Sequence, residues 1–466
     1  IFIISDHHRF DYMGCSGSDR VKTPNLDRLA QMGTKINGMY CNAPICVPSR
    51  ISITTGRYPI NTGCFTNSHP ADFSSPTFIH SLKEADYATG MIGKFHHHTG
   101  GGDEFGVVNE DDIKKLGYNH VFHTSGKAGI RFENDCRYSR YLKKKGVLDK
   151  VINWYGLNKG KEGKMQQPRD NWPLKTENKL DHLIAHKGSE FIESMVNKSK
   201  PFYLHLGLCG PHPPFDSPEK YQKMYDNVEP GSPIGGESRN KEYWRGLTAA
   251  ITEIDYLVGG IIDKLEEMGI KDETIIIYTS DHGDMAGDHG RVQKSVLHEG
   301  ATHVPFIVSG PGITENRKVD ALAELLDVGK TICDFVGVKS HHYDQGKSLK
   351  PVLTGDDNQH RQDVYTEMGS DKMYFDGRYK LMYGNPIKDT RDQYQFPEVI
   401  GARRPVNILP DTISLFDLEN DPYEEQDLTD NDEYIELLNE MKEKLLQRMI
   451  KNSQAVPCKD ALDQLM

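Results

Sequence analysis

The stretch Ile1-Phe2-Ile3-Ile4, followed at once by Ser5-Asp6-His7-His8-Arg9, decides the fold. A short apolar, β-branched run is typical of a buried parallel strand, and the polar residues after it then lie at the edge of a sheet. In open α/β sheets ligands bind beyond the carboxyl ends of the strands, so Asp6 stands where chemistry is expected. The alternative for a carboxylate that closes a strand is a capping residue without a catalytic role.

The same pattern of apolar run and polar turn recurs along the chain. Three further runs span 87–92, 202–206 and 274–279. They lead to the polar turns Gly93-Lys94-Phe95-His96, Gly210-Pro211-His212 and Ser280-Asp281-His282. Helical patterns precede or separate them, at 78–85, 179–197 and 247–268. This alternation predicts an α/β fold with a large, mostly parallel sheet sandwiched by helices.

Beyond about residue 355 the pattern changes. A β-hairpin with an Asp376-Gly377 turn is predicted over 372–383, followed by a strand at 414–418 and a closing amphipathic helix at 433–451. A smaller C-terminal antiparallel sheet with a helix is therefore expected. Because 466 residues exceed what one compact core usually holds, we expect a catalytic domain over 1–355 and a C-terminal subdomain over 356–466.

The composition narrows the class of partner. The net charge is −12 and the pI is near 5.9, which argues against nucleic acid because no basic stripe offsets the acidic balance. No apolar run approaches the length of a membrane span. The eight cysteines are scattered without a C-x-x-C pair, which indicates neither a zinc site nor a disulfide framework.

One of these cysteines lies in an unusual local sequence, Cys46-Val47-Pro48-Ser49-Arg50, which continues to Thr55-Gly56-Arg57-Tyr58-Pro59. Pro48 favours a defined turn and Ser49 can cap the helix that follows. Arg50 then lies one turn beyond Cys46 and can hold an anion beside it. The alternative is a buried structural thiol at the start of a helix.

The segment from Cys46 to Arg57 resembles the signature of the type I sulfatases, C-x-P-S-R followed by T-G-R, in the alkaline phosphatase superfamily. The resemblance extends over nearly the whole chain. It includes Asp6, Gly93-Lys94-x-His96, Pro211-His212, Asp281-His282 and Lys294, in this order. The resemblance implies a sulfuric ester hydrolase.

In that family a maturase oxidises the signature cysteine to formylglycine, so the resemblance implies this cofactor at Cys46. One hydroxyl of the aldehyde hydrate attacks sulfur, and the other later expels sulfate as the aldehyde re-forms. This is covalent catalysis with a built-in release step. A thiolate would instead form an adduct with no easy route to release.

The resemblance also assigns the other roles. The catalytic residues are expected to be Cys46, Arg50, Lys94, His96, His212 and Lys294. Arg50, Lys94 and Lys294 neutralise the charge of the transferred group. His96 takes a proton from the hydrate, and His212 protonates the leaving alcohol with help from Lys294. The expected metal ligands are Asp6, Cys46, Asp281 and His282.

The expected ion is Ca²⁺, with Mn²⁺ or Mg²⁺ as alternatives. Many relatives carry a second Asp where His7 stands, so we expect one fewer carboxylate ligand and leave His7 out of the metal site.

The substrate is expected to be a small anionic sulfate ester. The segments Gly100–Leu174 and Asn385–Pro410 are expected to be substrate-selecting insertions, the first of them polar, dotted with aromatics and without strong helices or strands. Its composition favours a sulfated carbohydrate over aryl or choline sulfate. The resemblance favours a periplasmic or secreted location, while a cytoplasmic one stays open because the chain begins at Ile1 without a Met. The oligomeric state also stays open.

Two alternatives to a sulfatase remain. A phosphonate monoester or phosphodiester hydrolase of the same superfamily can use the same modified cysteine, and the single Asp of the first segment fits it nearly as well. A non-catalytic glycan-binding relative would be expected to lose the nucleophile or its lysines, which are present here.

Overall fold

The computed structural model describes residues 1–97, 109–129, 136–155, 172–235, 240–384 and 413–453. The predicted insertion Asn385–Pro410 lies outside the described residues, as does part of Gly100–Leu174. Within the described part of the chain, no helix has both the length and the apolar character needed to cross a bilayer.

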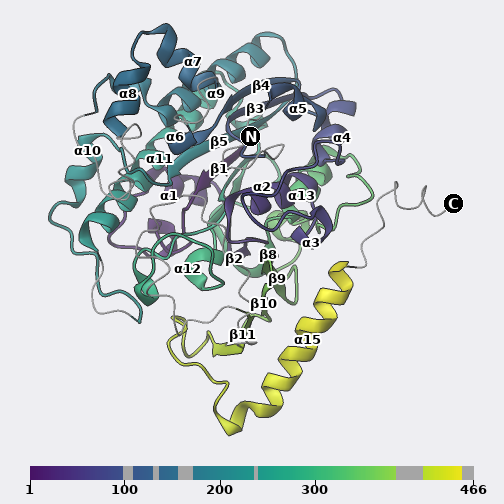
Figure 1. The fold of residues 1–466 in the computed structure, drawn as a ribbon. Coiled ribbons are helices and arrows are strands. Elements are labelled where there is room, and N and C mark those ends of the chain that lie inside the picture. The colour runs from purple at the N-terminus through teal and green to yellow at the C-terminus, as the bar shows by residue number, and fades with distance from the viewer. Residues whose placement is uncertain (98–108, 130–135, 156–171, 236–239, 385–412, 454–466) are drawn as a thin grey trace.

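An eight-stranded sheet forms the centre of the molecule (Figure 1). Its strands, in spatial order, are β4 (His120–Thr124), β3 (Ala88–Lys94), β5 (Phe202–Pro211), β1 (Phe2–Asp6), β6 (Ile276–Ser280), β7 (Phe306–Ser309), β2 (Gly33–Tyr40) and β8 (Arg317–Glu324). Strand β7 is antiparallel to both neighbours, and the other pairs are parallel. The prediction of a large, mostly parallel sheet is confirmed.

Helices cover both faces of this sheet, because successive side chains of its strands point to opposite faces. Ile3 packs in one core with side chains from α1 (Pro24–Gln31), α9 (Leu180–Asn197) and α11 (Lys241–Glu267). Its neighbours Phe2 and Ile4 belong to a second core. That core draws on α2 (Cys46–Thr55), α4 (Phe78–Glu84), α13 (Asp327–Val336) and α14 (Lys350–Thr354).

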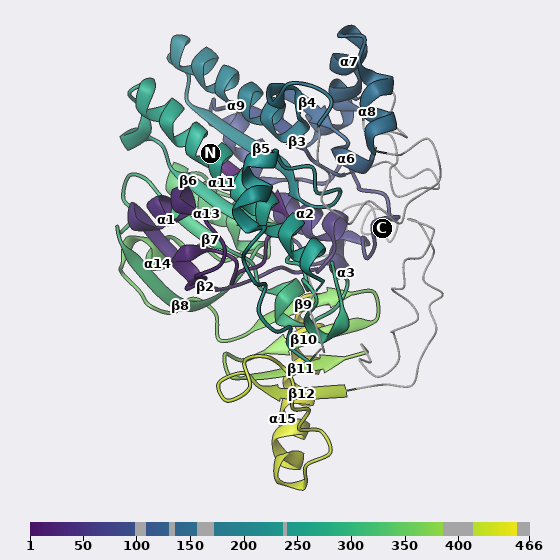
Figure 2. The ribbon, with the colours of Figure 1, turned by 90° about the vertical axis from the view of Figure 1, so that its left-hand side faces the viewer.

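The small C-terminal sheet is also confirmed. Four antiparallel strands follow one another in the order β12 (Ile413–Asp417), β11 (Tyr379–Tyr383), β10 (Asp371–Phe375) and β9 (Val364–Met368). Helix α15 (Ile435–Ser453) packs against β10 and β11 and projects at the end of the molecule away from the large sheet (Figures 1 and 2). The boundary at residue 355 stays a prediction, because Tyr58 packs in the same core as Met441 of α15.

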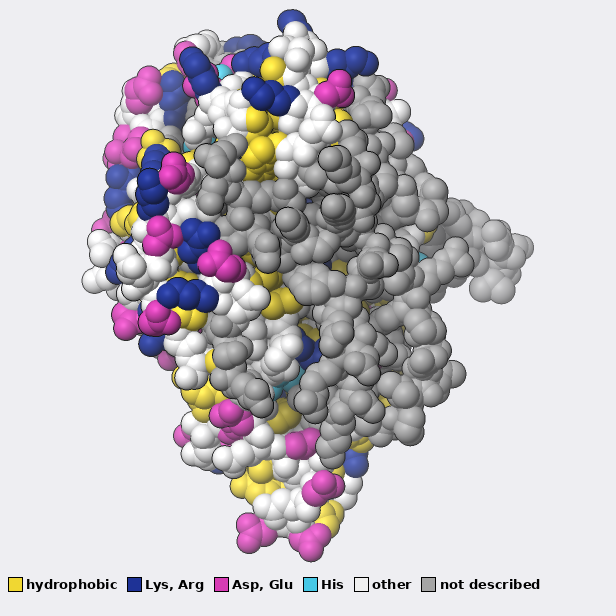
Figure 3. Space-filling view, turned by 60° about the vertical axis from the view of Figure 1, so that its left-hand side comes forward, with side chains coloured by type: hydrophobic (Ala, Val, Ile, Leu, Met, Phe, Trp, Pro, Cys, Tyr) yellow, Lys and Arg dark blue, Asp and Glu magenta, His cyan; other side chains and the backbone are white. Residues whose placement is uncertain are grey.

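The prediction that Gly100–Leu174 lacks strong elements is wrong for its described residues. They include α5 (Glu110–Lys115), the edge strand β4, α6 (Gly126–Gly129), α7 (Arg137–Lys144) and α8 (Leu148–Tyr155). These elements escape detection because they are short and turn few side chains inward. In α7, for example, the buried residues Tyr138, Ser139 and Leu142 stand among arginines and lysines. On the face in Figure 3, Lys and Arg side chains are interspersed with Asp and Glu.

Candidate active site

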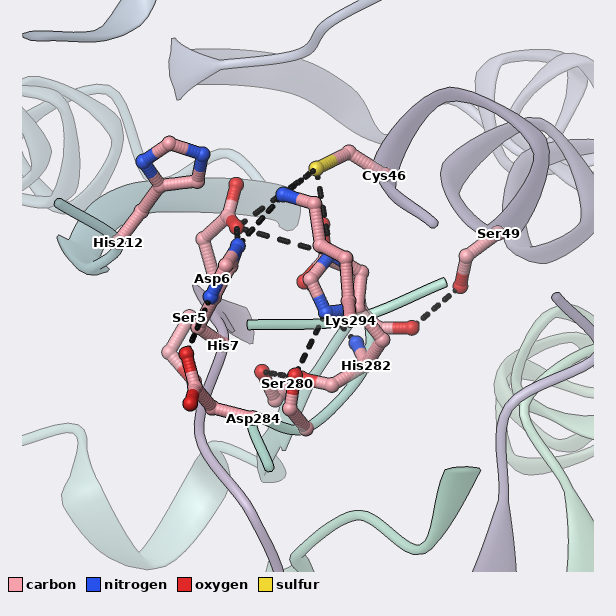
Figure 4. A network of polar contacts seen from close by, with 12 residues as sticks. Ser5, Asp6, His7, Cys46, Ser49, His212, Ser280, His282, Asp284 and Lys294 are labelled. Carbon is pink, nitrogen blue, oxygen red and sulfur yellow. Dashed lines mark hydrogen bonds and ion pairs between the residues drawn. The ribbon is translucent and has the colours of Figure 1, made fainter. Parts of the chain in front are cut away.

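The predicted polar turns meet at the carboxyl edge of the large sheet. Strands β3, β5, β1 and β6 are consecutive neighbours in the sheet, and they end at Lys94, Pro211, Asp6 and Ser280. Helix α2 begins with Cys46 and brings it to the same edge (Figure 4). The parallel arrangement therefore brings together side chains from segments up to 287 residues apart in the chain, as the hydrogen bond between Lys294 and His7 illustrates.

Cys46 is fully buried at the centre of this edge. Its Sγ lies 3.2 Å from Nε2 of His282 and 3.8 Å from Oδ1 of Asp6. The Nζ of Lys294 donates a hydrogen bond to the same Sγ over 3.1 Å. Burial, followed by the negative charge of Asp6, raises the pKa of the thiol to about 11. The unmodified thiol is therefore protonated near neutral pH and is not a thiolate nucleophile.

Asp6 is held between two cations. Nζ of Lys94 donates to its Oδ2 over 2.5 Å, and Nη2 of Arg50 donates to the same oxygen over 3.2 Å. Burial alone raises the pKa of Asp6, but the charges of Lys94 and Arg50 hold it well below its usual range. Asp6 is therefore a fixed negative charge within the protein interior.

Arg50 connects the segments that form the site. Its Nε donates to Oδ2 of Asp281 over 2.8 Å, and its Nη1 donates to the carbonyl oxygen of Lys94 over 3.0 Å. With the bond to Asp6, these contacts join α2 to the ends of β1, β3 and β6. The predicted role of Arg50 is charge neutralisation, and the geometry adds a framework role.

The segment after β6 fixes His282 in one tautomer. Its Nδ1 lies 2.9 Å from the carbonyl oxygen of Gly283, which can only accept, so Nδ1 carries the proton. The lone pair of Nε2 then faces Cys46. Asp281 supports this turn, because its Oδ1 accepts a hydrogen bond from the backbone N–H of His282 and its carbonyl oxygen accepts one from Ser49.

His7 lies in the site, although it is not among the ligands predicted from the sequence. Strand alternation would place it on the opposite face from Asp6. His7 instead adopts a left-handed backbone with φ of 75°, which interrupts the alternation and turns its ring toward the cluster. Its Nε2 lies 3.6 Å from Oδ1 of Asp6. A non-glycine residue with positive φ has no sequence signature, so this placement could not be read from the chain.

Four side chains could together hold a metal ion: Asp6, His7, Cys46 and His282. They are all buried, and their potential ligand atoms lie within 4.8 Å of one another. The sulfur of Cys46 stands here for the oxygen that a formylglycine hydrate would present. Asp281, a predicted ligand, is not in this set, although its Oδ1 lies 3.6 Å from Nε2 of His282. One carboxylate and two imidazoles suit a divalent cation.

The two predicted proton-transfer histidines flank this cluster. The His212 ring lies edge-on to the His7 ring, with centroids 4.4 Å apart (Figure 4). His96 follows β3 with φ of 61°, and within the described part of the chain its buried Nδ1 has no hydrogen-bond partner. Burial, together with the charge of Lys94 for His96 and of Lys294 for His212, holds the pKa of both rings well below the usual value. A bound anion would offset this positive potential and favour protonation.

Comparison with known proteins gives an independent view of the chain. A family model described as Sulfatase matches residues 1–338. The chain is 26% identical to an arylsulfatase of Clostridium perfringens over 489 residues, which cover 96% of this chain and 94% of that protein.

Solved structures share the fold. A phosphonate monoester hydrolase from Silicibacter pomeroyi superposes with a TM-score of 0.76 at 21% identity, covering 97% of this chain and 95% of the other. A protein in complex with its substrate D-glucosamine-2-N,6-O-disulfate superposes with a TM-score of 0.74 at 20% identity, covering 98% of each chain. At these identities the likeness concerns the fold alone.

Proposed function

The chain belongs to the sulfatase family of hydrolases, and on this premise we propose that it cleaves a sulfate monoester with a formylglycine made from Cys46. The observation that carries the proposal is the setting of Cys46. Its buried sulfur touches Lys294 and His282 and lies beside Asp6, at the edge where four parallel strands end. A structural thiol would have no need of such neighbours.

The charges around Cys46 suit a tetrahedral anion. Lys94, Lys294 and Arg50 face the carboxylates of Asp6 and Asp281, which leaves one net positive charge among these five side chains before any metal is counted. Fixed cations near developing negative charge require no reorganisation during the reaction. They would bind the sulfate group and stabilise the charge that builds on its oxygens.

A hydrated aldehyde at position 46 would supply the attacking oxygen and a route for sulfate release, and a divalent metal would supply Lewis-acid stabilisation there. Asp6, His282 and His7 fit the metal by their position and donor type, and Asp281 is the further ligand expected from the sequence. Ca²⁺ is the ion expected from the family, with Mn²⁺ or Mg²⁺ as alternatives.

Proton transfer falls to the two flanking histidines. His212 would protonate the leaving alcohol, with Lys294 beside it to stabilise the departing oxygen. His96 would accept a proton at position 46, and among the described residues its buried Nδ1 has no hydrogen-bond partner that would compete. Histidine suits both tasks because small changes in its environment move its pKa across neutrality.

For the substrate we propose a sulfated carbohydrate. The polar character of the segment Gly100–Leu174 supports this class, as does the glucosamine disulfate that one solved protein of the same fold takes as its substrate. A second candidate, phosphonate monoester hydrolysis, is favoured by His7, which puts an imidazole where many sulfatases have a second carboxylate. Partners are then the substrate and a maturase that oxidises Cys46.

The test is a comparison of rates with one preparation whose Cys46 has been converted. We expect hydrolysis of sulfated saccharides and of nitrophenyl sulfate to exceed that of a nitrophenyl phosphonate ester. Faster turnover of the phosphonate ester would favour the second candidate. Saccharide binding without any turnover by converted enzyme would point to a glycan-binding protein. Cys46→Ala is the matched variant and should lack turnover of all three substrates.

A further inference from the structure

His7 is fixed at both ring nitrogens. Its Nε2 lies 2.5 Å from Nζ of Lys294, an ammonium that can only donate, so Nε2 carries a lone pair. Its Nδ1 lies 2.9 Å from Oδ2 of Asp284, which matches a proton on Nδ1 donated to the carboxylate. Both contacts therefore assign the same tautomer, in which the Nε2 lone pair accepts from Lys294 and Nε2 lies 3.6 Å from Oδ1 of Asp6.

Asp284 is itself held by a complete set of hydrogen bonds. Its Oδ1 accepts from the backbone N–H groups of Ala286 and Gln293, over 2.8 and 3.1 Å. Its Oδ2 accepts from the hydroxyl of Tyr243 on α11 over 2.7 Å, in addition to His7. Tyr243, Asp284 and His7 are all buried. A carboxylate that orients an imidazole in this way is the usual support of a metal-binding histidine.

The resulting donor set differs from an oxygen-rich calcium site. Among the residues described, the imidazoles of His7 and His282, the carboxylate of Asp6 and the sulfur of Cys46 offer ligand atoms within 4.8 Å of one another. A metal at Nε2 of His7 would take the place of the hydrogen bond from Lys294. Ca²⁺ takes six to eight oxygen ligands. Two imidazoles and one carboxylate instead favour a first-row transition ion, which binds nitrogen well.

We propose that His7, positioned by Asp284 and Tyr243, is a ligand of the metal in this chain and that it makes the site select first-row transition ions over Ca²⁺. The inference rests on the proposed function only in that the metal binds at this site. It replaces the expectation of Ca²⁺ by one that follows from the nitrogen donors of this chain.

The test is direct observation of the ligands with Mn²⁺ as the probe. Metal-free protein loaded with Mn²⁺ is studied by pulsed electron paramagnetic resonance, which detects coordinated nitrogen. We expect signals from two imidazole nitrogens in the native protein and from one in His7→Asp. A single nitrogen in the native protein would overturn the proposal, and this readout does not depend on the folding of any variant.

Selectivity is measured by equilibrium dialysis against equal concentrations of Mn²⁺ and Ca²⁺. The native protein should retain Mn²⁺, and His7→Asp should shift the ratio toward Ca²⁺. Asp284→Asn leaves the ligands Asp6 and His282 unchanged and should weaken Mn²⁺ binding by about 10–100-fold. Tyr243→Phe should weaken Mn²⁺ binding less. Tyr256→Phe, an exposed hydroxyl deletion on the same helix, is the matched control. Retention of Ca²⁺ by the native protein would contradict the proposal.

These readouts require no turnover, so the two proposals can fail separately. Two coordinated nitrogens in a protein that does not hydrolyse sulfate esters would leave the metal inference standing and overturn the proposed function. An active sulfatase that binds Ca²⁺ through one nitrogen would do the reverse. Because an unmodified Cys46 thiol can itself bind metal, each measurement is repeated with Cys46→Ser.

Discussion

Two of the regions that bury charged side chains balance these charges differently. At the junction between α15 and the large sheet, Arg361 and Arg448 face the carboxylates of Glu324 and Asp327, and Arg448 also lies 3.3 Å from Asp363. At the catalytic edge the cations Lys94, Arg50 and Lys294 outnumber the carboxylates Asp6 and Asp281 that they face. At the junction the carboxylates at least match the arginines, whereas the five side chains named at the catalytic edge leave one positive charge for an anion.

His212→Ala should produce the largest loss of kcat/KM, and this loss should be confined to substrates with poor leaving groups. A sugar alcohol needs a proton as it departs, so kcat/KM for a saccharide sulfate should fall by about 10²–10⁴-fold. A nitrophenol leaves with little help, so kcat/KM for nitrophenyl sulfate should fall much less. The measurement is the ratio of the two losses.

His96→Ala serves as the comparison, because it should slow both substrates to a similar extent. His186→Ala, at an exposed histidine, should leave both unchanged. Equal losses from His212→Ala on the two substrates would show that this ring is not the general acid.

Arg448→Met should destabilise the fold without changing the catalytic activity of the folded protein. Its Nη2 donates to Oε1 of Glu324 over 2.9 Å and to the hydroxyl of Tyr58 over 2.8 Å. Removing one partner of a buried ion pair typically costs about 3–5 kcal/mol of unfolding free energy. Denaturant unfolding measures the loss, and Arg378→Met, at an ion pair whose arginine is half-exposed, should cost far less. Similar losses from the two variants would argue against a balanced buried junction.

Lys294→Met should show the opposite behaviour at the catalytic edge. Removal of one fixed cation should lower kcat by about 10²–10³-fold. Because the cations outnumber the carboxylates there, the free energy of unfolding should stay the same or rise. The two measurements are steady-state kinetics and denaturant unfolding, with the exposed Lys223→Met as control. A loss of both activity and stability would remove the distinction between the two regions.

The smallest expected effect is the change in the free energy of unfolding as the pH falls. His123, buried at the end of β4, has its pKa lowered by burial to about 4. The unfolded chain then binds a proton near pH 6.5 and the folded chain does not, so stability falls as the pH drops from about 6.5 to about 4. At the junction, burial alone raises the pKa of Asp327, but Arg361 and His360 hold it below its usual range. That contribution is lost only below about pH 4.

His123→Gln should therefore reduce the loss of stability between pH 7 and 5.5 by about 1 kcal/mol. Unfolding at the two pH values measures this difference, with the exposed His186→Gln as control. The same pH dependence in His123→Gln and the native protein would show that this histidine does not remain neutral in the fold.

The sequence predicts the parts of this molecule whose signals are local. The runs that end in Asp6, Lys94 and Ser280 are strands because their apolar residues form continuous buried segments, and parallel pairing then brings their ends together. Strand β2, Gly33–Tyr40, was not predicted, because glycines, Lys35 and Asn37 interrupt its apolar pattern. Its lysine is buried although sequence alone would place it outside.

In the candidate site, too, features with a local sequence signal could be predicted and features that depend on long-range contacts could not. Motif residues such as Cys46, Lys94 and His282 lie together as expected. The position of His7 beside this cluster was not predicted because it depends on a left-handed backbone, and the contact of Asp284 with its ring was not predicted because the two residues lie far apart in the chain. Long-range hydrogen bonds of this kind leave no pattern in the order of residues.

The most direct test of the central claim is the mass of the peptide that contains Cys46, measured together with activity. Preparations made with different amounts of maturase should contain different fractions of formylglycine at this position. The account predicts that kcat rises in proportion to the converted fraction and that fully unconverted protein is inactive. Full sulfatase activity in a preparation whose Cys46 is entirely unmodified would contradict it.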